Sequence, residues 1–472
     1  MVALHYIDKY CMQWYLSIYK YFSTSVLLKY YQSGLLFIRK QGIADLTYNT
    51  NGICYAFTTL VIPSILQSAG NICLIIVFMI CFLIFSPYVA LLFLFFVSLF
   101  IVAYVWLVGK DISQIGKEEI EAKKGQWETV QDCFNGYVEM EIYNAFPYFM
   151  KRFIKGINAI ISCQNRMKIK TEIPAYLLEM MMLVLLIIVF LISHSTEELV
   201  LLLSAVSIGV FKILPSIKQI ISGYNTLQNH LCTIDILYDA INLQCESLKR
   251  SRSVIYKDTI KFNDVDFYYD KQNQVLNRVN IEIKKGERIG IQGESGFGKT
   301  TLLNVLLGFL DPNNGQVLID ETNLADMNLQ MWHQQIGYVP QEVFIADDTI
   351  AGNIAFGLSH EKMNEQKIYE VLKIVQLYDW VKALPLDINT RIGENGCLVS
   401  CGQKQRLGIA RALYKKAQLL ILDEATSALD EVTEKNILSI IDRLTEKDSG
   451  RTLIMVSHNK YSMKMCERFI NI

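Results

Sequence analysis

Few features of this sequence point to a metal or redox centre. Its 11 cysteines are scattered from Cys11 to Cys466 without a CxxC pair, and no cysteine–histidine cluster has the spacing of zinc ligands. Free thiols in a reducing compartment or in apolar helices explain these cysteines better than disulfides do. The formal net charge of −1 argues against a broad surface for nucleic acid, so we expect no nucleic-acid partner.

Charged residues are absent from one long stretch of the N-terminal half. None occurs from Leu46 to Gly109, and a helix that crosses a bilayer needs about 20 apolar residues. The stretch therefore predicts two spans, separated at Ser86–Pro87, and two more follow later. We expect these spans near 60–85, 88–108, 174–193 and 199–221. The first residues contain no uninterrupted apolar run, which argues against a cleaved signal peptide.

Lysine and arginine are unevenly distributed around these spans. They are frequent in 110–172 and precede the first span as Arg39 and Lys40, whereas the turns at Pro87 and at 194–198 contain neither. By the positive-inside rule, the basic segments and the C-terminal half face the cytoplasm. Within the basic segment, 112–124 is patterned as an amphipathic helix that continues out of the membrane.

The C-terminal half contains a glycine-rich phosphate loop. Residues 293–300 read GESGFGKT, after an apolar run that ends at Ile291 and before a helix-forming run. Such a loop directs backbone N–H groups toward a phosphate, with Lys299 on the outer phosphates and Thr300 on Mg²⁺. The predicted ATP-binding residues here are Gly293, Glu294, Ser295, Gly296, Phe297, Gly298, Lys299, Thr300 and Thr301.

Five further motifs follow in a fixed order. They are 339–341 (VPQ), 399–403 (VSCGQ), 419–424 (LLILDE), 427–430 (SALD) and 456–458 (VSH). A single phosphate loop occurs by chance, but this ordered set does not. From about residue 258 onward the chain resembles the nucleotide-binding domain of ABC transporters. The resemblance implies an α/β P-loop ATPase that binds ATP and Mg²⁺ and couples ATP hydrolysis to transport.

The resemblance also implies roles for individual residues. Glu424 would orient and deprotonate the attacking water, Gln341 would sense Mg²⁺ and the water, and His458 would bind the γ-phosphate. These three are the predicted catalytic residues, and the predicted Mg²⁺ ligands are Thr300, Gln341 and Asp423. Tyr269 would stack on adenine, although a tyrosine at a strand end has the same pattern.

Two such domains are expected to close head to tail, so that each ATP also contacts the opposite subunit. Ser400, Gly402 and Gln403 would make this contact, and Asp430 would cross the dimer seam. The segment departs from the family's Leu-Ser-Gly-Gly-Gln because Cys401 replaces the first glycine. We therefore expect this site to hydrolyse ATP at a normal or a reduced rate.

The whole layout resembles an ABC exporter half-transporter. We expect an α-helical transmembrane domain over 1–250 and the ATP-binding domain over 251–472. About four complete spans and part of another are present against the six of the family, and the chain ends 14 residues after His458, so we expect it to be shortened at both ends. Coupling helices are expected in 131–142 and near 41–45, although an ordinary turn also explains the second segment.

The run 211–220 further resembles flippases for lipid-linked oligosaccharides. The expected protein is a homodimer or paired half-transporter in the bilayer of a bacterial plasma membrane, with an amphipathic, lipid-linked anionic substrate. A lipid or peptide exporter, or an ATP-binding remnant that cannot transport, are the alternatives. Glu179 and Lys212 are charged residues within spans: either both extend toward the interface, or Lys212 faces a cavity and attracts an anionic headgroup.

Overall fold

The computed structural model divides the chain into two compact units, Met1–Cys245 and Glu246–Ile472. It describes residues 2–85, 87–192, 196–243, 252–270, 273–294, 296–393, 396–446, 450–457 and 460–472. Some side chains in the apolar helices are outside this description, including that of Lys212. The headgroup role of Lys212 therefore stays a prediction.

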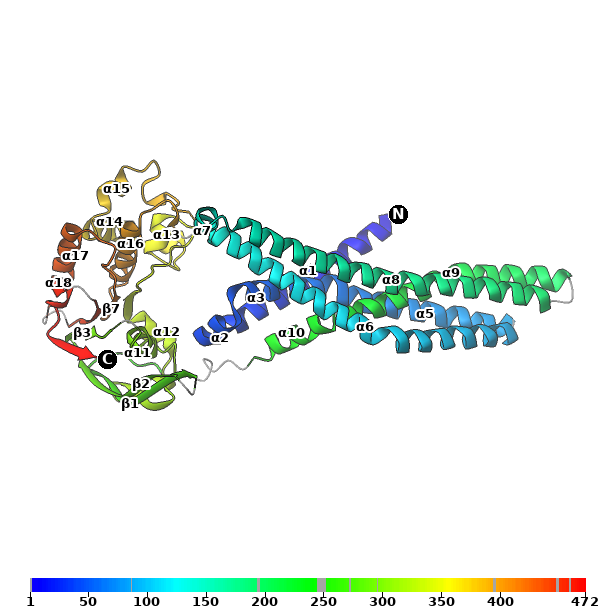
Figure 1. The fold of residues 1–472 in the computed structure, drawn as a ribbon, viewed down its shortest axis with the longest axis horizontal. Helices are drawn as coiled ribbons and strands as arrows, with labels where there is room; N and C mark the ends of the chain where they lie inside the picture. The colour runs from blue at the N-terminus through cyan, green and yellow to red at the C-terminus, as the bar shows by residue number, and fades with distance from the viewer. Residues whose placement is uncertain are drawn as a thin grey trace. The chain divides into compact units, whose positions relative to one another are not determined.

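The first unit consists of helices, and the long helices at 62–85, 87–135, 146–192 and 196–229 pack side by side (Figure 1). A proline at the first helical position is tolerated because its missing N–H has no partner there, and α6 begins in this way at Pro87. The elements are α1 (Val2–Gln32), α2 (Gly34–Gln41), α3 (Ile43–Tyr48), α4 (Cys54–Ala56), α5 (Ile62–Phe85), α6 (Pro87–Asn135), α7 (Tyr137–Ile142), α8 (Phe146–Ile192), α9 (Thr196–Asn229) and α10 (Leu231–Ile241), with π-helical turns at Asn49–Ile53 and Phe57–Val61.

The expected spans coincide with helices in this unit. The stretch Ile43–Ile80, with a mean hydropathy of 2.0, is the single helical stretch among the described residues that is long and apolar enough to cross a membrane, and only 6% of its most apolar window is buried. Its apolar side chains therefore face outward, as in Val77 and Ile80. Such a surface suits lipid better than water. The turn between α8 and α9 lies outside the described residues at 193–195.

The length of a helix in this unit does not depend only on the length of its apolar run. Helix α1 is continuous over 31 residues although lysines recur along it, so it is longer than the partial span that its sequence suggests. Within the segment 131–142, where a coupling helix is expected, a short separate helix α7 lies between α6 and α8, and its coupling role stays a prediction. Near 41–45, Gly42 with φ +82° separates α2 from α3.

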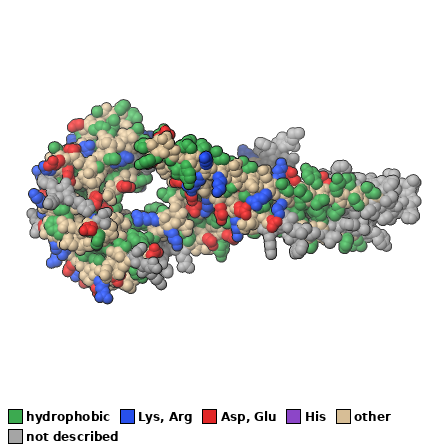
Figure 2. Space-filling view, in the orientation of Figure 1, with side chains coloured by type: hydrophobic (Ala, Val, Ile, Leu, Met, Phe, Trp, Pro, Cys, Tyr) green, Lys and Arg blue, Asp and Glu red, His purple; other side chains and the backbone are tan. Residues whose placement is uncertain are grey.

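Charged side chains gather along the middle of the helical unit, between α7 and the apolar parts of the long helices, as Figure 2 shows in blue and red. Helices α6 and α8 are joined there by ion pairs between Arg166 and Glu118 and between Lys170 and Asp111. This region corresponds to the basic segment 110–172. Beyond it, Glu179 on α8 pairs with Lys218 on α9. Glu179 is therefore not the isolated charge that the sequence suggests.

The second unit contains a parallel and an antiparallel sheet. The strand order is β6-β7-β8-β3-β9 in the parallel sheet and β2-β1-β4-β5 in the antiparallel one. The strands are β1 (Thr259–Asp270), β2 (Asn273–Lys284), β3 (Arg288–Gln292), β4 (Asn314–Ile319), β5 (Thr322–Asn323), β6 (Ile336–Val339), β7 (Leu419–Asp423), β8 (Thr452–Val456) and β9 (Arg468–Asn471).

Helices pack on these sheets around two apolar clusters. Every residue of β7 and β8 is buried, which is the pattern of central strands in a parallel sheet. The helices are α11 (Lys299–Leu306), α12 (Leu329–Gln334), α13 (Ile350–Ile354), α14 (Glu365–Ile374), α15 (Tyr378–Lys382), α16 (Cys401–Tyr414), α17 (Glu431–Leu444) and α18 (Lys460–Met463), with 3₁₀ turns at Leu324–Asp326, His360–Lys362 and Asp387–Asn389.

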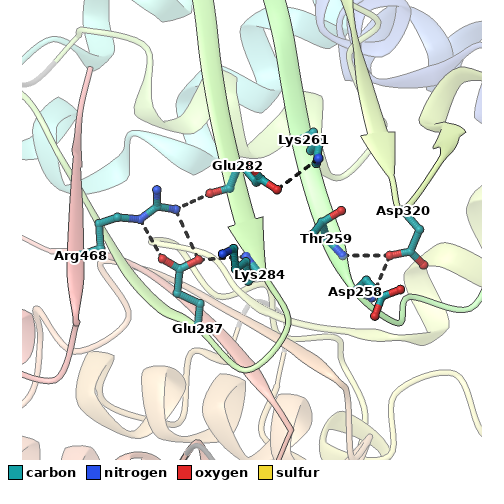
Figure 3. A network of polar contacts seen from close by, with 8 residues as sticks. All are labelled: Asp258, Thr259, Lys261, Glu282, Lys284, Glu287, Asp320 and Arg468. Carbon is teal, nitrogen blue, oxygen red and sulfur yellow. Dashed lines mark hydrogen bonds and ion pairs between the residues drawn. The ribbon is translucent and has the colours of Figure 1, made fainter.

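Two polar networks hold the edges of the sheets (Figure 3). The carboxylate of Asp320 accepts hydrogen bonds from three successive backbone N–H groups, at 257–259, over 2.8–3.0 Å. Arg468 on β9 contacts both carboxylate oxygens of Glu287 at 2.7 and 3.3 Å, and also the backbone oxygen of Glu282 on β2. The second network therefore ties the antiparallel hairpin to the edge of the parallel sheet.

Candidate active site

The predicted catalytic segments follow neighbouring strands of the parallel sheet. The phosphate loop follows β3, and Glu424 follows β7, with β8 paired between the two strands. Loops at the carboxyl ends of parallel strands meet at one edge of the sheet. The fold therefore brings together motifs that lie far apart in the sequence.

The phosphate loop owes its shape to glycine. Gly296 and Gly298 have φ values of +90° and +94°, which residues with a side chain rarely adopt. At Gly298 a Cβ atom would also lie 2.8 Å from Val275 Cγ1 on β2. The loop ends at the N-terminus of α11, where backbone N–H groups and the helix dipole favour an anion.

Lys299, the first residue of α11, is buried and turns back onto the loop. Its ammonium donates to the backbone oxygens of Gly293 at 2.8 Å and of Glu294 at 3.0 Å. A cavity of about 620 Å³ opens beside Gly293 and Lys299, with Ser457 on its wall. The lysine thus has a defined position at the edge of this cavity, whose other walls come from β3, α18 and β9.

Asp423, the last residue of β7, is 3% exposed. Burial, together with the adjacent carboxylate of Glu424, raises its pKa to about 6, although Lys299 and a hydrogen bond from Tyr338 oppose the rise. Tyr338 lies on β6 and was not among the residues predicted from the sequence. The only sequence feature that could have indicated Tyr338 is its position directly before the motif 339–341.

Glu424 and Gln341 are in direct contact. The side-chain Nε2 of Gln341 donates to Oε2 of Glu424 at 2.9 Å, while the backbone N–H of Glu424 donates to Val456 O at 2.8 Å. Glu424 has a φ of +50°, an uncommon conformation that is held by this backbone bond to β8. Three strands therefore fix the position of the predicted general base.

Tyr269 lies near the end of β1 and is 46% exposed as a residue. Its hydroxyl is 3.3 Å from Oγ1 of Thr301 on α11, and Phe267 packs edge-on against its ring at 5.0 Å. The tyrosine therefore lies next to the helix that the phosphate loop starts, with a ring face available for stacking. The exposed side chain of Phe297 is also part of this loop.

The predicted signature residues form a helix cap. Ser400 is the N-cap of α16: its hydroxyl accepts from the backbone N–H of Gln403 at 3.2 Å, and Oε1 of Gln403 accepts from the backbone N–H of Ser400 at 2.8 Å. This reciprocal arrangement is a capping box. It leaves the N-terminus of α16 preorganised for an anion.

The cysteine in this segment fits the local backbone. Cys401 is the first residue of α16, is exposed, and is not among the described residues with positive φ. A glycine is therefore not needed there for conformation. At Gly402, in contrast, a Cβ atom would lie 3.1 Å from the backbone oxygen of Ala428.

Asp430 is likewise a helix cap. Its carboxylate accepts from the backbone N–H of Thr433 at 3.0 Å at the start of α17, and this bond lowers the pKa of Asp430. Ser295 and His458 lie outside the described residues, so their predicted contacts with phosphate stay predictions.

The comparisons with known proteins agree with this geometry. The family model described as ABC transporter matches residues 276–427. The second unit is an ABC-type ATPase domain. Domains of this type bind ATP, and the phosphate loop and Asp423 lie within the matched residues.

Similar proteins extend the resemblance beyond this domain. An ATP-dependent lipid A-core flippase of Paraburkholderia xenovorans is 29% identical over 79% of this chain and 64% of its own length. Another, of Saccharophagus degradans, is 36% identical over 51% of the chain and 40% of its own length. The chain thus spans less than two thirds of the length of these relatives.

A solved structure described as a bacterial Atm1-family ABC exporter with ATP bound is similar over 98% of this chain and 81% of its own, with a TM-score of 0.85 and 21% identity. This similarity shows the fold: a helical N-terminal region followed by an α/β P-loop ABC domain. The predicted fold class is therefore confirmed.

The residues around Asp423 fit a magnesium ion. Mg²⁺ prefers oxygen ligands, and the site offers the Asp423 carboxylate, the Thr300 hydroxyl and the Gln341 amide oxygen. The raised pKa of Asp423 is the sign of a buried carboxylate that lacks a full compensating charge, which a divalent cation supplies. The donor set, rather than any observed ion, supports this assignment.

Proposed function

We propose that the chain is a subunit of an ATP-driven exporter that dimerises in a bacterial plasma membrane and flips an amphipathic lipid with a large polar group. The observation that carries the proposal is the contact of Gln341 with Glu424 beside the phosphate loop and Asp423. These are the parts that phosphoryl transfer from ATP to water requires. The long helices ahead of this domain supply the membrane part.

In this proposal the chain's own residues position water and neutralise charge. Glu424 accepts the proton of the attacking water, and Gln341 holds the carboxylate of Glu424 in place. Lys299 exchanges its loop carbonyls for the phosphate oxygens, and Tyr269 stacks on adenine. A bound Mg²⁺ would neutralise phosphate charge, with Asp423 and Thr300 as its holders.

The dimer follows from the position of the signature cap. Ser400 and Gly402 present a helix N-terminus and a backbone without a Cβ, which is the chemistry that a γ-phosphate needs. Within one subunit these groups cap their own helix rather than the phosphate loop. A second copy, or a paired half-transporter, would therefore bring its signature segment to the ATP.

The membrane location rests on the surface of the helical unit. The outward-facing apolar side chains of Ile43–Ile80 suit the lipid interior, and the ion-paired segment of α6 and α8 suits the cytoplasmic side. The domain matched by the ABC family model would face the cytoplasm, where ATP is available.

The substrate class rests on two resemblances. The run 211–220 resembles flippases for lipid-linked oligosaccharides, and two relatives are named as flippases of lipid A-core. Both kinds of cargo join a lipid to a large polar group. A lipid of this architecture is therefore the substrate that we propose. If its headgroup is anionic, the headgroup would bind near Lys212.

The decisive test uses Glu424→Gln in the full-length chain, reconstituted in lipid vesicles. We expect hydrolysis to fall by about 10²- to 10⁴-fold, because the general base is lost, while ATP binding is retained. ATP-driven transfer of a fluorescent lipid with a bulky polar headgroup should stop. Glu431→Gln, which changes an exposed glutamate paired with Lys435, is the matched control and should leave both activities unchanged.

Near-normal hydrolysis in Glu424→Gln would contradict the assignment of the base. Hydrolysis that moves a peptide but no lipid would favour the peptide exporter. Hydrolysis without movement of either would contradict the transport proposal while leaving the ATPase domain in place.

A further inference from the structure

A buried glutamine joins the signature helix to the loop that ends at Asp430. Gln405 lies on α16 and is 5% exposed. Its Nε2 donates to the hydroxyl of Ser427 at 3.0 Å, and its Oε1 accepts from the backbone N–H of Ala428 at 2.9 Å. One amide group therefore uses both its donor and its acceptor on two successive residues of the loop.

A close backbone approach brings the same helix and loop together. The Cα of Gly402 approaches so closely that a Cβ there would lie 3.1 Å from the backbone oxygen of Ala428. The first turns of α16 therefore meet the loop at Ser427 and Ala428, with Gln405 as the buried hydrogen-bonding group.

This helix and this loop have related tasks in the proposed function. The cap at Ser400 faces the ATP of the opposite subunit, and Asp430 crosses the same seam. We propose that Gln405 is a positioning residue that holds the loop 427–430 against the signature helix, so that both groups reach the opposite ATP in a fixed relation. This inference rests on the proposed ATP-driven dimer.

The loop has a separate anchor, so Gln405 is not required for its folding. Oε1 of the buried Glu434 accepts from the hydroxyls of Thr426 at 2.8 Å and of Ser462 at 3.0 Å. These bonds hold the start of the loop to α17 and α18. Loss of Gln405 would thus release the middle of the loop and leave both ends in place.

The test compares two glutamines with the same chemistry in the full-length protein. Gln405→Leu removes both hydrogen bonds and takes away the side-chain partner of the Ala428 backbone N–H. We expect kcat for ATP hydrolysis to fall roughly ten- to hundredfold. Binding of a fluorescent ATP analogue in the absence of turnover should be unchanged, because the phosphate loop does not contact Gln405.

Gln335→Leu is the matched control. Gln335 likewise uses both its acceptor and its donor, accepting from Tyr256 N at 2.8 Å and donating to Val254 O at 2.9 Å, but on other segments than the loop 427–430. It should lower thermal stability and leave kcat unchanged. Equal losses of kcat in both variants, or a normal kcat in Gln405→Leu, would overturn the positioning role.

Ser427→Ala tests the same contact from an exposed residue, and so remains informative where Gln405→Leu does not fold. We expect about a fivefold lower kcat, as for one hydrogen bond, and no further loss when it is combined with Gln405→Leu. A normal kcat in Ser427→Ala together with additive losses in the double variant would contradict the coupling.

The failure of this inference can be told apart from failure of the proposed function. If Glu424→Gln abolishes hydrolysis but Gln405→Leu has a normal kcat, only the positioning role is wrong. If the wild-type protein shows no ATP hydrolysis, or shows hydrolysis that Glu424→Gln does not reduce, the proposed function and the inference are both wrong.

Discussion

The two groups of side chains that we propose to bind ATP differ in how many hydrogen-bond and charge partners their own subunit provides. Around the phosphate loop, Asp423 has a raised pKa and Lys299 contacts carbonyls of its own loop. In the signature segment, Ser400 and Asp430 cap helices through good hydrogen bonds. The comparison teaches that the first group includes a buried carboxylate whose charge is not fully compensated, whereas the capping groups already have hydrogen-bond partners before a ligand arrives.

The largest expected effect that tests this comparison is in Asp423→Asn. In the folded protein the pKa of Asp423 is about 6, above its unfolded value, so ionisation of Asp423 costs stability as pH rises from about 4 to about 6. The uncharged variant avoids this cost. Without nucleotide and Mg²⁺, it should be more stable than wild type by roughly 3 kcal/mol at pH 7.5, and equal to it below about pH 4.

Denaturant titrations at the two pH values measure this difference. Asp430→Asn provides the comparison because the pKa of Asp430 is lowered by its backbone hydrogen bond. Asp430 therefore contributes stability that is present above its unfolded pKa and is lost as pH falls through its folded pKa. The variant should be slightly less stable than wild type at pH 7.5. The same sign of change in both variants would contradict the contrast between the two groups.

The next effect is in Lys299→Ala. Its ammonium would make charge-assisted bonds to phosphate, each worth about 1.5–3 kcal/mol, so nucleotide affinity should fall roughly ten- to hundredfold. Calorimetric titration with ATP measures this loss. Lys464→Ala is the control because Lys464 lines the same cavity but lies outside the phosphate loop. Equal losses in both variants would indicate a general charge effect instead.

The smallest effect is in Ser400→Ala. Removing the N-cap of α16 should cost about 1 kcal/mol of stability, and hydrolysis should also fall, because the hydroxyl would face the opposite ATP. Asn364→Ala removes a similar cap, which accepts from Lys367 N at 3.0 Å at the start of α14. It should lower stability equally with normal hydrolysis. Normal hydrolysis in Ser400→Ala would confine that residue to capping.

The sequence motifs predicted those parts of the site in which the chemistry depends on the type of residue and on the order of the motifs. The ordered motifs from 293–300 to 427–430 indicated the α/β fold. Gln341 and Glu424, which belong to two of these motifs, are hydrogen-bonded in the structure. Contacts that depend on packing between distant segments were not visible. Tyr338 and Gln405 have no motif of their own, and their partners are set by strand pairing and helix docking.

The helical unit shows the same limit. Runs without charge predicted the apolar helices and the break at Ser86–Pro87. The pairing of Glu179 with Lys218 was missed because the two residues lie on different helices. Sequence spacing alone cannot say which faces of two helices meet.

The contact of Arg468 with Glu287 and the Glu282 carbonyl has a consequence for both ends of the proposed nucleotide site. Strand β2 pairs with β1, which carries Tyr269, and β9 ends beside Gly293, where a Cβ would lie 2.8 Å from the Ile472 carbonyl. Arg468 therefore links the hairpin that carries Tyr269 to the strand that ends beside Gly293, so a change at this surface arginine would affect two segments of the proposed nucleotide site at once.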